Sequence, residues 1–264
     1  MLLPMTDVAV HVRNADVPWN IFSADDYQRA NYAELQAEDQ EIIRLVSRFF
    51  IQAFADRPRA RRGIDVGSGP NLYPALLMLP WTEQILLTDF SASNVHSLRQ
   101  QIADERTVWA WQPFWQELRN GEDYRRIAEP RKQLREACYG EPGCAGIEQR
   151  TIFDLPSARW DLGTMFFVAE SITEDPEEFR RAIASFVGAL TPGAPFAAAF
   201  MAGSKGYPVA GTRFPALPIT PDDVAERFGQ LGVCQLSVEL PGTSHRVRAG
   251  YEAMIVATGF AGER

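Results

Sequence analysis

Apolar and polar positions follow one another along this chain in a way that predicts a regular succession of strands and helices. Short apolar runs bounded by glycine, proline or aspartate have the character of buried strands. These runs occupy residues 64–66, 85–89, 148–153, 161–168, 194–201, 233–240 and 251–258. Between them, apolar residues recur at helical spacing in 72–79, 91–98, 176–190 and from Thr220 onward. The succession predicts an α/β fold with a seven-stranded, mostly parallel sheet that contains one antiparallel strand.

Two segments depart from this succession. Residues 1–57 begin as an irregular arm and continue, from an N-cap at Ser23, into a helical stripe that ends before Pro58, which predicts an N-terminal helical lid. Residues 107–146 form an insertion that is rich in aromatic side chains, namely Trp109, Trp111, Phe114 and Trp115, ahead of a charged helical stretch over 121–138. The insertion either forms a wall of a substrate site or packs over the sheet edge. No linker interrupts the chain, so we expect residues 1–264 to form a single domain.

The turn after the first predicted strand is the most informative stretch. Strand 64–66 carries Asp65 and leads into Gly67-Ser68-Gly69, after which a helical pattern begins. Glycine tolerates positive φ and lets a ligand approach the backbone closely. The amides of such a turn face whatever lies at the carboxyl end of the strand, so the stretch predicts a nucleotide-cofactor site.

The residues of this turn distinguish between two cofactors. A dinucleotide site requires Gly-x-Gly-x-x-Gly, and the third glycine position is Leu72. Asp65 also fits poorly beside a pyrophosphate, but it fits the cationic ammonium and sulfonium of S-adenosylmethionine. Asp89, at the end of the second predicted strand, is placed to receive ribose hydroxyls in either type of site. Asp154, after the third predicted strand, is placed to accept from the amine of adenine. An NAD-dependent oxidoreductase on a similar sheet remains the alternative.

Composition narrows the range of partners. The net charge of −8 and the isoelectric point near 5.0 disfavour nucleic acid and anionic membranes. The N-terminus lacks the features of a secretory signal, and no apolar run reaches the roughly 18 residues of a membrane span. The three cysteines and three histidines lack metal-type spacing, so we expect plain thiols in the cytoplasm and no metal. The expected partner is a small-molecule acceptor, and the expected state is a monomer or a homodimer.

Several motifs together resemble one known family. They are Phe22-x-x-x-Asp26-Tyr27-x-x-x-x-Tyr32, Ile64-Asp-Val-Gly-Ser-Gly-Pro70 with Tyr73, Leu87-Thr-Asp-Phe90 with Asn94, Trp111-x-Pro113, Phe153-Asp-Leu155, Leu190-Thr-Pro-Gly193 and Phe214-x-x-Leu-Pro218. Over about residues 20–260 the chain resembles the nicotinamide, phenylethanolamine and thioether/indolethylamine methyltransferases. These are class I, Rossmann-like enzymes that methylate small molecules with S-adenosylmethionine.

The resemblance implies a set of cofactor-binding residues. Tyr27 and Tyr32 would close the site over the methionine end of the cofactor, the glycine turn would line that end, and Asp89 would hold the ribose. The implied cofactor-binding residues are Tyr27, Tyr32, Gly67, Ser68, Gly69, Asn71, Tyr73, Asp89, Phe90, Asn94, Asp154, Leu155 and Phe166. Asn31 departs from the family, which has a tyrosine there.

The implied acceptor site is less complete. Phe167-x-x-Glu170 resembles the phenylethanolamine enzyme, in which this phenylalanine lines the aromatic pocket and this glutamate binds the amine. Met201 stands where the nicotinamide enzyme has an aspartate, which speaks against nicotinamide as the substrate. A second amine-binding acid is expected near 248–250, and the sequence has none there. Tyr207 is a further candidate pocket residue.

The expected reaction is direct transfer of the methyl group to an acceptor nucleophile, most naturally an amine nitrogen of an aromatic or secondary-metabolite substrate. Glu170 is the candidate catalytic group, because a buried carboxylate beside the amine could accept or relay its proton. The alternative for Glu170 is an acid that caps a helix near a strand end. A non-catalytic relative that only binds the cofactor is a further alternative.

Overall fold

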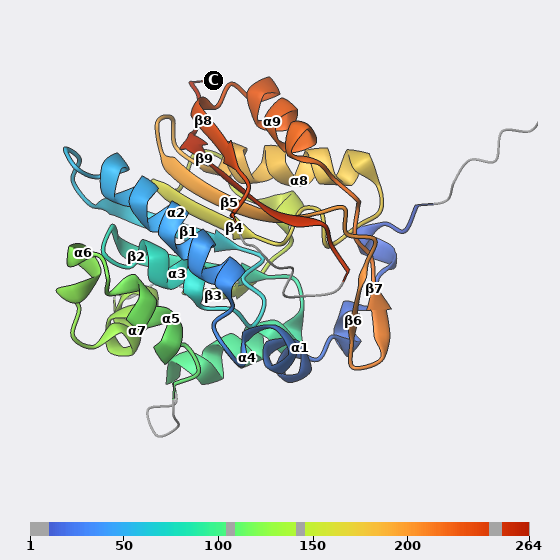
Figure 1. Cartoon of the computed structure of the whole chain (residues 1–264), viewed down its shortest axis with the longest axis horizontal. Coiled ribbons are helices and arrows are strands. Elements are labelled where there is room, and N and C mark those ends of the chain that lie inside the picture. Colours follow the sequence, from blue (N-terminus) through green and yellow to red (C-terminus); the bar gives the residue numbers. More distant parts are fainter. Residues whose placement is uncertain (1–10, 104–108, 141–145, 243–249, 264) are drawn as a thin grey trace, which may run out of the picture.

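A seven-stranded sheet forms the centre of the computed structural model, which describes residues 11–103, 109–140, 146–242 and 250–263 (Figure 1). Its strand order is β3-β2-β1-β4-β5-β9-β8. The strands are β1 (Ala60–Val66), β2 (Thr82–Asp89), β3 (Ile147–Gln149), β4 (Leu162–Phe166), β5 (Pro195–Ala202), β8 (Cys234–Glu239) and β9 (Ala253–Phe260). Strands β1 to β5 pair in parallel, and β9 runs antiparallel to both of its neighbours, β5 and β8. The predicted mostly parallel sheet with one reversed strand is therefore confirmed.

The predicted third strand was wrong in its extent. Strand β3 stops at Gln149, and residues Ile152–Asp154 form a short 3-10 helix, η3, in place of the end of the expected strand 148–153. The side chain of Thr151 caps this turn by accepting from the amide of Phe153 at 3.3 Å. The hydroxyl of Ser185 donates to the carbonyl of Ile152 at 2.5 Å, which fastens η3 to the neighbouring helix. Asp154 therefore lies on a loop turn beyond the sheet and not at a strand end.

Helices cover both faces of the sheet (Figure 1). The helices are α1 (Ala24–Tyr32), α2 (Ala37–Ala53), α3 (Tyr73–Met78), α4 (Ala92–Ala103), α5 (Gln112–Leu118), α6 (Glu122–Arg125), α7 (Pro130–Tyr139), α8 (Pro176–Ala189) and α9 (Pro221–Gln230). Helices α2, α3, α5 and α7 share one buried cluster with the sheet, and α8 and α9 share the other. Strand β5 shows why: Ala197 and Ala199 face the first cluster, while Phe196 and Phe200 face the second.

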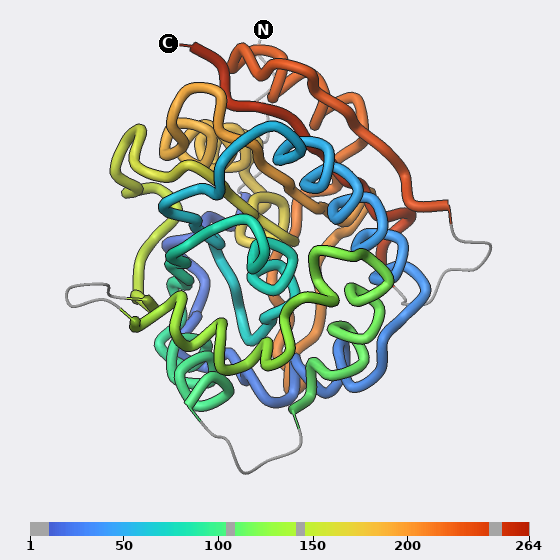
Figure 2. Tube along the Cα trace, turned by 90° about the vertical axis from the view of Figure 1, so that its left-hand side faces the viewer, coloured from blue at the N-terminus to red at the C-terminus, as the bar shows by residue number. Residues whose placement is uncertain are grey.

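The aromatic-rich insertion packs against the first of these clusters. Trp111, Phe114 and Trp115 are fully or almost fully buried, and in Figure 2 the insertion helices, drawn in green, lie beside α2 and α3. The charged stretch predicted over 121–138 is interrupted, because Pro130 begins the new helix α7. The described part of the insertion contributes no residue to the cleft described below, so it behaves as core packing.

A small hairpin that the hydrophobic pattern did not reveal follows β5. Its strands are β6 (Tyr207–Val209) and β7 (Thr212–Phe214). Phe214 is fully buried and stacks on Trp19 of the N-terminal arm with ring centroids 5.4 Å apart. The arm also contains two 3-10 turns, η1 (Asn14–Asp16) and η2 (Trp19–Ile21). Arm and hairpin thus form one aromatic cluster beside the carboxyl ends of the parallel strands.

The segment predicted as an N-terminal lid contains two helices, α1 and α2. Ser23 caps α1 as predicted, with its hydroxyl accepting from the amide of Asp26 at 3.3 Å. Helix α2 begins at Ala37 and ends before Pro58, as the apolar stripe indicates. No helix among the described residues combines the length and the apolar character that crossing a membrane requires.

Candidate active site

A cleft lies at the carboxyl ends of β1, β2 and β4, beneath the N-terminal arm. Its empty space is about 740 Å³, including the open mouth. The lining residues that the sequence predicted are Tyr27, Tyr32, Gly67, Ser68, Gly69, Asn71, Asp89, Phe90, Asn94, Phe166, Phe167 and Tyr207. The structure thus brings together residues that are far apart in the chain, from Tyr27 to Tyr207.

The glycine turn forms the floor of the cleft. Gly67 and Gly69 have φ of +66° and +58°, a region that side chains other than glycine rarely adopt. A Cβ at Gly67 would come within 2.6 Å of Val168, so packing against the segment after β4 requires glycine there. A Cβ at Gly69 would meet no other atom within 4 Å. The backbone at Gly69 is therefore open to a ligand, as the turn predicts.

Asp89 fixes the geometry of this floor. Its Oδ2 accepts from the amide of Gly69 at 2.8 Å, and its Oδ1 accepts from the amide of Ser91 at 2.8 Å. The side-chain amide of Asn94 also donates to Oδ1, at 3.1 Å. Burial raises the pKa of the Asp89 carboxyl, and these hydrogen bonds partly oppose that rise. Because a carboxylate has about four acceptor positions, Oδ2 keeps capacity for a ligand hydroxyl.

Asp65 lies behind the turn and not on the cleft surface. Its side chain is 1% exposed, and Oδ1 accepts from the hydroxyl of Thr164 on β4 at 2.7 Å. Oδ2 has no hydrogen-bond partner among the described residues. Burial raises the pKa of Asp65 to about 7. The glycine turn therefore separates Asp65 from the cleft. Any effect of this acid on a cationic ligand must be transmitted through the turn.

Aromatic side chains form the upper wall. Trp19 and Phe22 come from the arm, Tyr27 and Tyr32 from α1, and Tyr207 from the hairpin. The ring of Tyr27 lies 6.1 Å from the rings of both Tyr32 and Tyr207. The arm, α1 and the hairpin therefore meet over the cleft.

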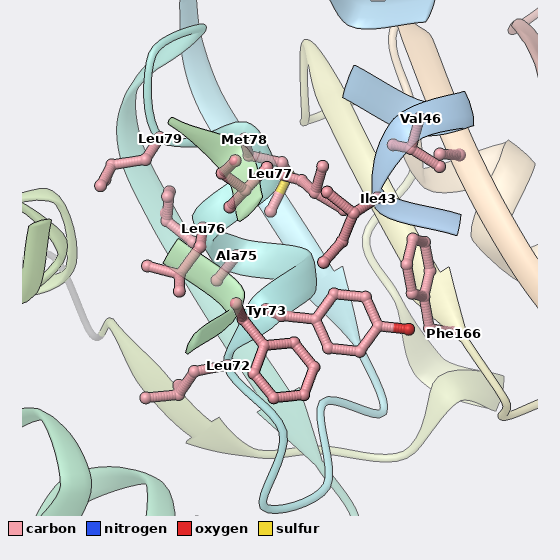
Figure 3. Packing of buried hydrophobic residues seen from close by; sticks show 14 of the residues in the cluster. Ile43, Val46, Leu72, Tyr73, Ala75, Leu76, Leu77, Met78, Leu79 and Phe166 are labelled. Atoms are coloured by element: carbon pink, nitrogen blue, oxygen red, sulfur yellow. The ribbon is translucent and has the colours of Figure 1, made fainter. Parts of the chain in front are cut away.

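Tyr73 is not part of the cleft surface. It is fully buried in α3, where its ring lies 6.1 Å from Tyr32 and 5.5 Å from Phe166, both of which line the cleft. Figure 3 shows Tyr73 and Phe166 together in the core beneath α2. Tyr73 thus supports two lining residues from behind.

One end of the cleft is formed by the segments that follow β2 and β3. Phe90 stands at the mouth with 46% of its surface exposed, and Thr151 and Ile152 lie among the lining residues. Asp154 and Leu155 are not among the lining residues, and Asp154 is exposed. The η3 turn explains this, because it replaces the expected strand end and brings Ile152 to the cleft.

The segment after β4 forms the remaining wall. Phe167 lines the cleft with φ of +59°, a strained conformation for a bulky residue, at a cost of about 1–3 kcal/mol. Glu170, by contrast, is 0% exposed and lies behind the lining. Its Oε1 accepts from the amide of Met201 on β5 at 3.0 Å and from the hydroxyl of Ser171 at 3.1 Å.

Two further features of Glu170 bear on its chemistry. Oε2 has no hydrogen-bond partner among the described residues, and burial raises the pKa of the carboxyl to about 7. Met201 is half-buried and is likewise absent from the lining. The helix-capping alternative for Glu170 is not what the structure shows, because Asp175 provides the side-chain cap of α8.

Sequence reasoning missed part of the lining. The missed residues are Asn14, Trp19, Ser91, Arg150, Thr151, Ile152, Val168, Ser171 and Ile172, and Phe22 and Pro70 were quoted only as parts of motifs. Several of them adjoin predicted residues in the chain, such as Ser91 after Phe90 and Ser171 after Glu170, and proximity alone could have found them. Asn14 and Trp19 carry no local signal, because the arm has no hydrophobic period.

Solved structures share this fold. The N-methyltransferase NodS from Bradyrhizobium japonicum, in complex with S-adenosylhomocysteine, has a TM-score of 0.53 at 12% identity, over 92% of this chain and 100% of that chain. Magnesium protoporphyrin IX methyltransferase from Synechocystis, with bound S-adenosylmethionine, has a TM-score of 0.55 at 12% identity, over 91% and 92% of the two chains. The fold is therefore that of the class I S-adenosylmethionine-dependent methyltransferases.

Comparison with known sequences gives the family. The model of the NNMT/PNMT/TEMT family matches residues 12–249, and the chain belongs to this family. Human nicotinamide N-methyltransferase is 23% identical over 216 residues, which are 80% of this chain and 81% of that protein. Mouse indolethylamine N-methyltransferase is 25% identical over 131 residues, 49% of this chain and 50% of that protein. The chain is thus a methyltransferase that acts on a small molecule, with S-adenosylmethionine as its cofactor.

The cleft residues fit this cofactor. The backbone at Gly69 is open, Asp89 keeps acceptor capacity on Oδ2, and the buried Oδ1 of Asn94 has no hydrogen-bond partner among the described residues. These groups suit the donor-rich ribose and amine groups of an adenosine ligand.

Proposed function

We propose that this protein transfers a methyl group to the nitrogen of a small aromatic amine. The observation that carries the proposal is the buried carboxylate of Glu170, whose Oε2 has no hydrogen-bond partner among the described residues and which adjoins the lining residue Ser171. Such an atom is costly unless a ligand supplies a donor. An amine with an N–H group is the simplest donor that also serves as a methyl acceptor. The relatives with the printed names nicotinamide N-methyltransferase and indolethylamine N-methyltransferase support a nitrogen acceptor.

The cofactor-binding residues are proposed from their places around the cleft. Asp89 would accept from the ribose, and Phe90 and Asn94 would border the adenosine. The glycine turn would receive the methionine end under Tyr27 and Tyr32, with Phe166 beside it. Asn71 lines the cleft, and its Oδ1 accepts from the amide of Tyr73 at 3.0 Å. Asp154 and Leu155 would reach the adenine edge only from outside the lining of the cleft.

The acceptor would lie against the segment after β4. Phe167 would line an aromatic pocket with Tyr207, and Met201 would replace the polar residue expected for nicotinamide. S-adenosylmethionine supplies an activated methyl group, so the protein must mainly align the acceptor and exclude water. The proton that the amine loses as its nitrogen gains the methyl group would pass to Glu170, whose pKa lies near 7, through the hydroxyl of the lining residue Ser171, which donates to Oε1 of Glu170. The positions near 248–250, where the family has a second acid and this sequence has none, lie mainly outside the described residues.

The cellular setting and the partners are a further part of the proposal. A net charge of −8 supports a small-molecule acceptor in the cytoplasm, without nucleic acid. We propose a monomer or a homodimer.

A matched panel of acceptors tests the proposed reaction. Purified protein is incubated with S-adenosylmethionine labelled on the methyl group and with an aromatic amine, phenol and thiol that share one ring system. We expect label to appear on the amine at least tenfold faster than on the other two. Preferred labelling of the phenol or thiol would refute the nitrogen acceptor. Tight S-adenosylhomocysteine binding without transfer to any of a broad set of acceptors would favour the non-catalytic alternative.

A further inference from the structure

The side-chain amide of Gln101, which lies outside the cleft, forms hydrogen bonds with three segments that lie around the cleft. Gln101 lies on α4, and its Oε1 accepts from Nε2 of Gln28 at 3.1 Å and from Nε1 of Trp111 at 2.6 Å. Its Nε2 donates to the carbonyl of Pro70 at 3.0 Å and to the hydroxyl of Ser97 at 3.1 Å. An amide offers two acceptor positions and two donor hydrogens, so every hydrogen-bonding position of Gln101 is used.

The partners of Gln101 come from elements with different tasks. Gln28 follows Tyr27 on α1, the helix that brings two tyrosines to the cleft. Pro70 follows Gly69 and itself lines the cleft. Trp111 begins the packed part of the insertion, and its ring lies 5.5 Å from Tyr32. The side chain of Gln101 therefore contacts α1, the end of the glycine turn, and Trp111, which packs against Tyr32 of α1.

The position of Gln101 is itself held firmly. Nε and one terminal nitrogen of Arg131, on α7, donate to the backbone carbonyl of Gln101 at 3.0 and 2.8 Å. Ser97, one turn earlier on α4, is 7% exposed and fixes the orientation of the amide. A partly buried amide with a fixed backbone and four partners has one favoured rotamer, so it can transmit a displacement of one partner to another.

We propose that Gln101 is a positioning residue that couples the tyrosine-bearing helix α1 to the glycine turn. Cofactor binding at the turn then favours the closed position of α1, and a closed α1 favours cofactor binding, because such coupling is reciprocal. The inference rests on the cofactor site proposed above. Gln101 does not line the cleft, so its effect passes through Pro70 and Gln28.

Two substitutions separate this coupling from simple packing. Gln101→Met keeps the length of the side chain and removes all four hydrogen bonds. Gln28→Ala, on a half-buried part of α1, removes only the bond between α1 and Gln101. Arg29→Ala is the matched control on the same helix, because its side chain is 73% exposed and pairs with Asp26 within α1.

The readouts are the Kd of S-adenosylhomocysteine by calorimetry, the KM and kcat of methyl transfer, and amide hydrogen exchange over residues 24–32 with and without that ligand. We expect Gln101→Met to raise Kd and the KM for S-adenosylmethionine about tenfold, and Gln28→Ala about fivefold, with kcat at saturation little changed. The double variant should match Gln101→Met alone, because both changes break the same connection. Ligand should slow exchange over 24–32 in the wild type and in Arg29→Ala, and clearly less in the two variants.

The outcomes distinguish a failure of the proposed coupling from a failure of the proposed cofactor site. Wild-type protein that fails to bind S-adenosylhomocysteine would remove the proposed cofactor site and the coupling together. Wild-type protein that binds it, with Gln28→Ala equal to Arg29→Ala in both Kd and exchange, would overturn the coupling alone. This second comparison stands even if Gln101→Met folds poorly.

Discussion

The two sides of the cleft are built in different ways. On the proposed cofactor side, Asp89 and the glycine turn are joined mainly through backbone amides, and the residues involved lie within one strand–turn–helix unit and the strand beside it. On the proposed acceptor side, aromatic rings from the arm and the hairpin meet the segment after β4. The first side is local and held by the backbone, whereas the second is an assembly of side chains from distant segments.

This difference shows where specificity can change. A backbone cradle depends on glycines with positive φ and on one buried acid, so it tolerates few substitutions. Side chains on an arm and a hairpin can be exchanged without disturbing the sheet. The strained backbone at Phe167 lies in the segment after β4, on the proposed acceptor side. We therefore expect substitutions on the cofactor side to abolish binding and substitutions on the acceptor side to alter turnover or the choice of substrate.

Replacing Asp89 with asparagine tests the cofactor side and should have the largest effect. Asparagine carries no charge, and its side-chain NH2 group could face the Gly69 amide at the place where the Asp89 carboxylate accepts a hydrogen bond. Loss of about two charge-assisted hydrogen bonds costs roughly 3 kcal/mol, which corresponds to about a hundredfold rise in Kd. Calorimetric titration with S-adenosylhomocysteine measures this. Asp154→Asn is the matched comparison, and because Asp154 is exposed we expect no more than about a threefold change. Equal effects of the two changes would contradict the assignment of Asp89.

The sequence predicted the sheet well because parallel strands are buried on both faces and leave continuous apolar runs. Its errors fell where tertiary contacts decide the conformation. The apolar residues Ile152 and Phe153 resemble a strand, yet Thr151 caps a turn there and the pairing with β2 ends at Gln149. The hairpin β6–β7 was missed because its strands are only three residues long and pack on the distant arm.

The candidate site was predictable to a similar degree. Residues fixed by local chemistry, such as Gly69 and Asp89, could be placed from the sequence, because turn geometry and strand ends determine them. Asn14 and Trp19 could not, since only the folded arm brings them to the cleft. The sequence also could not show that Asp65 and Glu170 lie behind the surface, because the depth of a side chain depends on the packing around it.

Replacing Glu170 with glutamine tests the acceptor side and should have an intermediate effect. Glutamine can still accept from Met201 and Ser171 but cannot take a proton. We expect kcat to fall about tenfold, from the loss of one charge-assisted contact, while the Kd of S-adenosylhomocysteine stays within twofold. Steady-state kinetics and calorimetry on the same preparation separate the two. Glu177→Gln, on the surface of α8, is the control and should leave both unchanged. A large change in cofactor affinity for Glu170→Gln would show that the two sides are not separate.

The same variant should change how stability depends on pH. Burial raises the pKa of Glu170 from 4.5 to about 7, so the folded state binds more protons than the unfolded state between these values. The stability linked to this protonation is complete below pH 4.5 and is lost as the pH rises through 7. The loss is roughly 3 kcal/mol in the wild type and absent in Glu170→Gln. Denaturant titrations at several pH values should therefore show the variant gaining on the wild type between pH 5 and 8. A constant difference across that range would contradict a raised pKa at Glu170; Asp65 titrates similarly in both proteins and cancels.

Replacing Tyr207 with phenylalanine should have the smallest effect, and we expect that effect only on the acceptor side. The hydroxyl of Tyr207 donates to the carbonyl of Ser171 at 3.2 Å and so ties the hairpin to the segment that follows β4. Phenylalanine keeps the ring and its stacking on Phe214, so only this one hydrogen bond is lost. At about 1 kcal/mol, the loss should raise the KM of the acceptor at most fivefold, with cofactor affinity unchanged.

Tyr139→Phe, on the exposed surface of the insertion, is the matched control. If Tyr207→Phe weakened S-adenosylhomocysteine binding as much as it raised the acceptor KM, the hairpin would belong to both sides of the cleft, and the division between a local cofactor side and an assembled acceptor side would fail there.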